Sequence, residues 1–143
     1  MDVLSLLRSK NRCLLRFLEA SKNFLTETQT LGVLPSLPDF ELQRESILKA
    51  ISLYDRKVTE AIPHISAADR TPELSKAVEQ SLQEKDAILA EIVIADQQVL
   101  KLVEAEKNRV GRELAATNKS RNLNQKFKSS WVAEAGEEID KTL

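Results

Sequence analysis

Residues 72–131 read PELSKAVEQSLQEKDAILAEIVIADQQVLKLVEAEKNRVGRELAATNKSRNLNQKFKSSW and contain no proline after the first position. Apolar residues recur through this run at the three-, four- and seven-residue intervals of one helix face. This slowly drifting face consists of Val78, Leu82, Leu89, Ile92, Val99, Leu102 or Val103, Val110, Leu114, Leu123, Phe127 and Trp131. Thr71, Pro72 and Glu73 supply the capping hydroxyl, the first-turn proline and the first-turn carboxylate of a helix start. The sequence therefore predicts one helix over about 72–131, about 90 Å long and uninterrupted at Gly111.

The segments before this run are separated by prolines. All four prolines of the chain lie between residues 35 and 72, and each starts or ends a helix more readily than it sits inside one. Apolar periodicity predicts helices over about 2–30 and about 39–62, with a linker at 31–38 and a turn at 63–71. Residues 133–143 are acidic and contain little to bury, so we expect them to form a frayed tail.

These elements predict an all-α fold. We expect an antiparallel helical hairpin or three-helix bundle in a single domain of residues 1–143, with a long, overhanging, coiled-coil-like last helix. The pattern of residues 44–58 recurs at 85–99, and Ile47 and Ile88 are equally distant from the middle of the 63–71 turn. The second helix should therefore pack along the first half of the long helix. The first helix could complete a bundle there or lie along the second half, and the sequence leaves both arrangements open.

Composition excludes several classes of function. With one cysteine, Cys13, and one histidine, His64, the chain has no internal disulfide and no multi-histidine or cysteine–histidine metal site. Its three glycines lie too far apart for a phosphate-binding loop. We expect Cys13 to be a structural thiol, and Asp55 and Asp96 to be solvated or ion-paired rather than a catalytic pair. The chain is expected to be no enzyme, to need no cofactor and, without a signal peptide or bilayer-spanning run, to be cytoplasmic.

Charge is segregated along the chain, although the whole sequence has a net charge of only −1. Residues 39–100 contain seven bases and twelve acids, whereas residues 101–131, here called the basic segment, contain eight bases and three acids. The apolar stripe of the basic segment is too sparse to form a core of its own. It consists of Val110, Leu114, Leu123, Phe127 and Trp131. We predict that these residues bind a helix of a partner protein.

Other occupants of this stripe are open at the level of sequence. The first helix of the same chain could cover it, or two chains could bury it in a homodimer. The bases near Phe127 and Trp131 could also hold phosphates while the rings stack on nucleobases, although we expect no nucleic-acid partner. A membrane-surface helix needs a denser apolar face than Leu123, Phe127 and Trp131 provide, so no membrane insertion is expected.

The chain resembles a known family in its helical patterns. The pattern (Arg/Lys)-(Glu/Asp)-x-Ile-Leu-x-x-Ile-x-x-x-Asp occurs at 44–55 and again at 85–96, and the long helix ends Lys126-Phe127-Lys128-Ser129-Ser130-Trp131. With these features in a small all-helical chain, about residues 2–131 resemble the FlgN-type flagellar export chaperones. That family, with the related FliT-type chaperones, holds late flagellar subunits in the cytosol and delivers them to the type III export apparatus.

The resemblance implies partners and a binding surface. The implied clients are hook-associated proteins of the hook–filament junction, bound through an amphipathic client helix that the distal part of the last helix embraces. By position, this surface corresponds to Val110, Leu114, Leu123, Phe127 and Trp131. The family typically has a tyrosine near the end of this helix that helps docking to the export gate, whereas here the only tyrosine is Tyr54 and Phe127 has the comparable place. The alternative interpretation is a self-associating structural coiled coil or adaptor, in which the same stripe forms a homo-oligomer seam.

Overall fold

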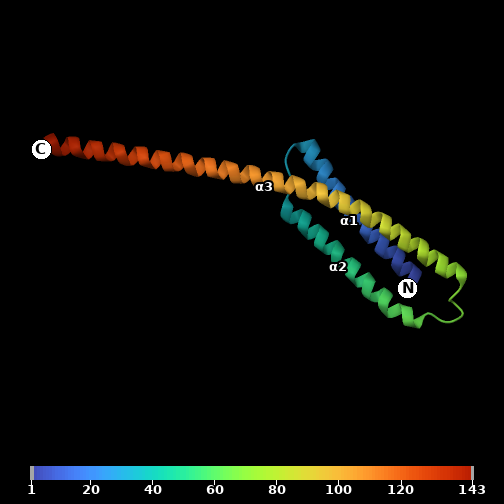
Figure 1. The fold of residues 1–143 in the computed structure, drawn as a ribbon. Helices are drawn as coiled ribbons and strands as arrows, with labels where there is room; N and C mark the ends of the chain where they lie inside the picture. The colour runs from blue at the N-terminus through green and yellow to red at the C-terminus, as the bar shows by residue number, and fades with distance from the viewer. Residues whose placement is uncertain (1, 143) are drawn as a thin grey trace. The chain divides into compact units, whose positions relative to one another are not determined.

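The computed structural model describes the backbone of residues 2–142 and the side chains of residues 2–129. It contains α1 (Val3–Leu31), α2 (Leu37–Ala61), the short 3₁₀ helix η1 (Ile62–His64) and α3 (Pro72–Thr142) (Figure 1). No strand occurs within these residues. The predicted all-α fold with a long last helix is therefore confirmed.

Side-chain caps set the helix starts. The Asp2 carboxylate accepts a hydrogen bond from the backbone N–H of Ser5 at 2.7 Å, and this bond holds the pKa of Asp2 below its ordinary value. The Thr71 hydroxyl accepts from the N–H of Leu74 at 3.2 Å, in the predicted position before Pro72. The cap of α2 is Ser36 rather than the predicted Asp39, so α2 begins at Leu37 with Pro38 in its first turn.

The ends of α1 and α3 also follow from the local sequence. Gly32 ends α1 in a left-handed conformation with a φ of 71°, which glycine adopts without steric cost. The α3 helix does not end near residue 131 as predicted but continues to Thr142. The expected frayed tail is thus helical in its backbone, because no proline interrupts it and it is rich in alanine and glutamate, which favour helices.

The chain forms two compact units, and the boundary between them falls inside α3. Unit 1 extends to Val103, and unit 2 begins at Glu104. Unit 1 contains α1, α2 and the first part of α3, while unit 2 consists of the remaining residues of α3. The expectation of a single domain stays a prediction.

Unit 1 is a three-helix bundle in which α1 packs on the first part of α3. The Asn11 side-chain amide donates to the Ser81 carbonyl oxygen at 2.9 Å, and the Ser21 hydroxyl donates to Asp96 at 3.2 Å. Residue numbers rise together in these two contacts, so α1 and α3 run in the same direction, and α2 runs in the opposite direction beside them (Figure 1). Of the two arrangements open for the first helix, the complete bundle is the one found.

All three helices contribute to the core of unit 1. One cluster contains Cys13, Leu14, Phe17, Leu18, Ile51, Ile92 and Ala95, and a second contains Ala20, Phe24, Phe40 and Val99. The rings of Phe24 and Phe40 stack with their centroids 4.4 Å apart. Ile47 of α2 and Ile88 of α3 both pack against the first cluster, so the two helices share this core. That these two residues lie side by side stays a prediction.

Candidate partner-binding surface

Four of the five residues predicted to bind a partner are exposed on α3. The exposed fractions are 47% for Val110, 60% for Leu114, 59% for Leu123 and 66% for Phe127. All four lie in unit 2, where every described side chain from residue 107 to 129 is exposed. The side chain of Trp131 lies outside the described residues. The described part of unit 2 therefore has no buried core, as the sparse stripe predicted.

The predicted stripe divides into two patches on opposite sides of α3. Val110 and Leu114 are four residues apart and share one side, as do Leu123 and Phe127. The nine residues from Leu114 to Leu123 amount to about two and a half turns of a continuous α-helix, which places these two leucines on opposite sides. One partner helix lying straight along this part of α3 can therefore contact one patch but not both.

The Leu123–Phe127 patch lies in a basic part of α3. From Leu114 to Ser129 there are four bases and no acid, and the bases are Lys119, Arg121, Lys126 and Lys128. Lys119 and Lys126 are one helical turn before and after Leu123, so their ammonium groups flank this patch. An acidic or neutral amphipathic helix suits this combination of apolar centre and cationic rim.

The Val110–Leu114 patch lies beside a local ion-pair network. The Arg109 guanidinium donates from Nε to Glu106 at 3.1 Å and from Nη1 to Glu113 at 2.6 Å. These hydrogen bonds lower the pKa of Glu106 and raise that of Arg109. These hydrogen bonds link two consecutive turns of the helix on either side of Gly111. A methyl group added at Gly111 would have no atom within 4 Å. The network supports the helix where glycine is intrinsically unfavourable.

The other candidate residues named from the sequence have structural surroundings. Cys13 is buried in the first core cluster, as expected of a structural thiol. Asp55 pairs with Lys10 Nζ at 2.5 Å, and Asp96 pairs with Arg44 Nη2 at 2.8 Å. The expectation that both aspartates are solvated or ion-paired is confirmed. Among the described residues, no group of histidine, cysteine, aspartate or glutamate side chains could hold a metal ion.

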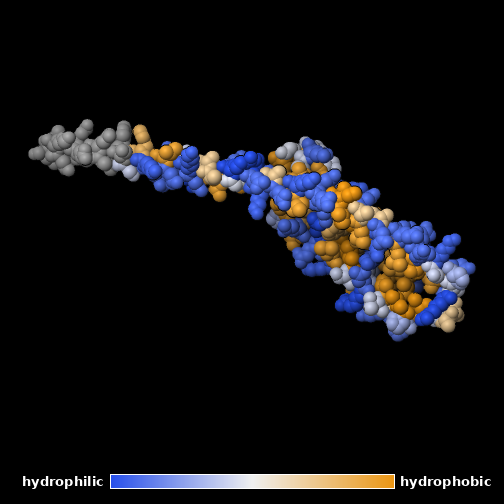
Figure 2. Space-filling model, in the orientation of Figure 1, coloured by the Kyte–Doolittle hydropathy of each residue, from blue (hydrophilic) through white to orange (hydrophobic). Residues whose placement is uncertain are grey.

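Sequence reasoning missed an exposed apolar surface on unit 1, which we call the α2–α3 face. It consists of Leu48, Leu82, Leu89, Val93 and Leu100, with exposed fractions of 50%, 39%, 39%, 55% and 57%. Leu82 and Leu89 were predicted to lie on the packed face of the long helix, but each is displaced from the core residue Ile92 by part of a turn. Figure 2 shows hydrophobic side chains gathered along this part of the molecule. The seven- and four-residue spacing of the α3 members was the available signal.

Sequence reasoning also missed the buried polar contacts between helices. Asn11, Ser21 and Ser81 are each less than a tenth exposed, and Asn11 donates to both the carbonyl oxygen and the hydroxyl of Ser81. Small uncharged polar residues inside a helix give no periodic signal that separates a buried position from an exposed one.

Within the described residues, no helix is long and apolar enough to cross a bilayer. A scan against protein-family models and searches of curated proteins and solved structures give no match to this chain.

Proposed function

We propose that this chain is a cytoplasmic chaperone, without enzymatic activity, that binds late flagellar export substrates and delivers them to the flagellar type III export apparatus. The clients would be hook-associated proteins of the hook–filament junction. One observation supports the proposal best: Leu123 and Phe127, one turn apart on a continuous helix, are 59% and 66% exposed. Lysine residues lie one turn before and after Leu123. The likeness to FlgN-type chaperones in the patterns at 44–55 and 85–96 adds the client class.

Such a chaperone works by affinity alone. Its bound client helix cannot assemble early, and release at the exporter needs no nucleotide on the chaperone. Burying a leucine or phenylalanine side chain contributes about 1.5–3 kcal/mol, so Leu123 and Phe127 can anchor an amphipathic helix. The surrounding lysines and arginines favour a client helix with acidic rims and speed its association.

The division of the stripe into two patches refines the binding surface. We propose that Leu123 and Phe127 form its centre, because Lys119 and Lys126 flank them, whereas Val110 and Leu114 face the opposite side beside Glu106 and Glu113. Trp131, four residues after Phe127, would extend the same side by one turn.

The test compares two double variants in the full-length chain. Leu123→Ala with Phe127→Ala should abolish co-purification of a hook-associated protein from native cytosol, read by mass spectrometry. With the terminal helix of that client as a synthetic peptide, calorimetry should show affinity at least about tenfold weaker, since about 1.4 kcal/mol of apolar contact corresponds to that factor.

The matched control is Val110→Ala with Leu114→Ala, which truncates two branched aliphatic side chains on the other side of the same helix. It should retain the client and its affinity. Equal loss in both variants would show that client binding does not use one side of α3. A wild-type chain that retains no flagellar protein, and is instead a tight oligomer with Leu123 protected, would favour the self-associating coiled coil.

A further inference from the structure

Three bases of unit 2 lie in one row beside the Leu123–Phe127 patch. Leu123 and Phe127 are four residues apart on one side of α3, so they take positions d and a of a heptad written abcdefg. In the same register, position g at the edge of the patch is taken by Arg112, Lys119 and Lys126. Because these bases follow one another at seven-residue intervals on a continuous helix, they form a straight row about 21 Å long, which we call the g row.

The opposite edge of the patch has no charge. It corresponds to position e of the heptad, which is taken by Thr117 and Asn124. The other bases of this stretch, Arg121 and Lys128, take position b, on the side of α3 that faces away from the patch. A helix packed over the patch therefore meets cations along one of its flanks and uncharged side chains along the other.

The charges of the g row are available to a partner. All three side chains are exposed, and none of them forms an ion pair with a side chain that the structure describes. The acids of the preceding turns, Glu106 and Glu113, are paired with Arg109 instead. An acid brought by a partner helix therefore meets a base that is not already neutralised.

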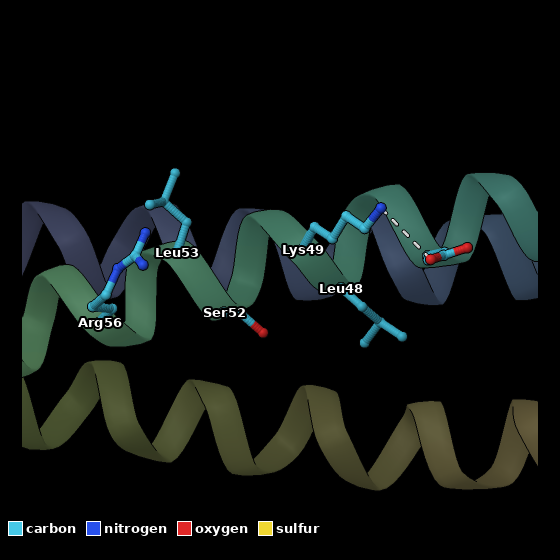
Figure 3. Close-up of a pocket in the computed structure, with 6 residues that line it drawn as sticks. Leu48, Lys49, Ser52, Leu53 and Arg56 are labelled. Atoms are coloured by element: carbon cyan, nitrogen blue, oxygen red, sulfur yellow. Dashed lines mark ion pairs between the residues drawn. The ribbon is translucent and has the colours of Figure 1, made fainter.

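The α2–α3 face, which is also exposed and apolar, differs from the patch in this respect. Beside Leu48 on α2, Lys49 pairs with Glu45 at 3.6 Å (Figure 3). On α3, Lys85 pairs with Asp86 at 3.5 Å. Since these lysines are neutralised within unit 1, the described part of this face offers an acidic helix nothing comparable to the g row.

The position of the acids on a partner helix decides how that helix can pair with the g row. In two parallel helices, position g of one faces position e of the other, whereas in two antiparallel helices position g faces position g. A partner with acids only at e therefore matches the g row when it is parallel to α3. A partner with acids only at g matches the g row when it is antiparallel.

We propose that Arg112, Lys119 and Lys126 determine the specificity of the patch. They select an amphipathic client helix that carries Asp or Glu on one flank of its apolar stripe, and the acidic flank sets the direction of the client along α3. This inference rests on the proposed function, because it describes the occupant of the same patch. It adds a requirement on the client that apolar contact with Leu123 and Phe127 does not impose.

The first test is charge reversal in the full-length chain. The probe is a synthetic amphipathic peptide of about three heptads with leucine at a and d, glutamate at e and glutamine at g. Lys119→Glu with Lys126→Glu should weaken its binding at least about tenfold in calorimetry at about 0.15 M salt, because attraction along the flank becomes repulsion. A second peptide with lysine in place of the glutamates should bind this variant better than it binds wild type.

The matched control is Arg121→Glu with Lys128→Glu, at position b of the same two heptads. It changes the net charge equally, so any effect of overall charge is the same in both variants. Its affinity for the glutamate peptide should stay within about threefold of wild type, because these side chains point away from the patch. Circular dichroism should show both variants folded, since all four positions are exposed. Equal weakening in the two variants would overturn the proposal.

The second test reads the direction of the bound peptide. A nitroxide is attached to Gln125→Cys, at position f on the outer side of α3 near the distal end of the patch, while the buried Cys13 stays in place. The peptide with glutamate at e should show NMR line broadening in its C-terminal half. A peptide of the same composition with glutamate at g should show broadening in its N-terminal half. Broadening of the same half in both peptides would contradict selection of direction by the g row.

Failure of this proposal is distinguishable from failure of the proposed function. A hook-associated protein that co-purifies with wild type and equally with both charge-reversed variants, but is lost with Leu123→Ala and Phe127→Ala, contradicts the role of the g row and leaves the chaperone function standing. Selective weakening of the glutamate peptide by the g-row variant, without any flagellar protein co-purifying with wild type, supports the g row and contradicts the flagellar client.

Discussion

Asp96 is the residue at which the three helices of unit 1 are tied together by polar contacts. Its carboxylate accepts a hydrogen bond from Ser21 of α1 at 3.2 Å and from Arg44 of α2 at 2.8 Å. The Arg44 guanidinium also lies over the rings of Phe17 and Phe40, 4.4 Å and 5.1 Å from their centroids. Removing the carboxylate would leave a largely covered cation without its acceptor.

Asp96→Ala should lower the free energy of unfolding by about 1–2 kcal/mol, because a partly buried charge-assisted hydrogen bond is lost and Arg44 is left unpaired. Urea denaturation followed by circular dichroism measures this change. Asp96→Asn keeps acceptor capacity for Ser21 and should cost less.

The control for Asp96 is Glu91→Ala on the same helix. Glu91 is 3.9 Å from Lys22 Nζ, and both side chains are more than half exposed. Such surface pairs contribute little, so the change should stay within about 0.5 kcal/mol. Equal effects of the two alanine substitutions would show that Asp96 is no more than a surface charge.

The α3 helix passes through Gly111 in a region without tertiary support. Gly111→Ala should raise the local helix stability by about 1 kcal/mol, because alanine loses less backbone entropy and its methyl group meets no atom within 4 Å. Amide hydrogen exchange should slow around residues 107–116, while the urea midpoint of unit 1 stays unchanged. Ala116→Gly, five residues further along α3, should speed exchange by a similar factor, and an unchanged rate in both variants would contradict a continuous helix here.

The same stretch should respond to acid through Glu106. Arg109 lowers the pKa of Glu106, so the pairing stabilises the helix fully above the ordinary value of 4.5 and is lost as the pH falls through the lowered pKa. The protection factors of the amides at residues 106–113, which compare each exchange rate with that of an unstructured peptide at the same pH, should therefore fall below about pH 4.5, the ordinary pKa of Glu106. Arg109→Gln should return the pKa of Glu106 toward its ordinary value, read by carbon-13 NMR titration, and should remove most of the pH dependence.

The presence of each helix could be predicted from the sequence. The side of the helix on which each apolar residue lies, and the residue at which each helix ends, were predicted less well. Spacing of apolar residues and the Thr71-Pro72 start located α3 correctly. The same spacing joined Leu114 and Leu123 into one stripe, because an approximate drifting face was followed across nine residues with no large apolar residue to fix the phase. The sequence does not predict the helical continuation beyond residue 131, because an acidic stretch with little to bury is typical of a frayed end.

For the whole molecule, the fold class followed from few glycines, clustered prolines and helical periodicity. The position of α1 did not, because an amphipathic helix of its length can cover either half of α3. The deciding contacts are Asn11 with Ser81 and Ser21 with Asp96, which no pattern of apolar residues reveals. The residues of the candidate site could be named from the sequence and four of them are exposed on α3, but the division of the site into two patches and the α2–α3 face required the three-dimensional arrangement.

The pairing of α1 with α3 also has a consequence for biosynthesis. The contacts that hold α1 in place join residues 70 and 75 positions apart in the chain. On the ribosome, α1 and α2 are therefore complete long before the residues that bury Phe17 and Asn11 have been made. The nascent chain therefore exposes one side of α1 until Asp96 has left the exit tunnel, and the bundle cannot close before that point.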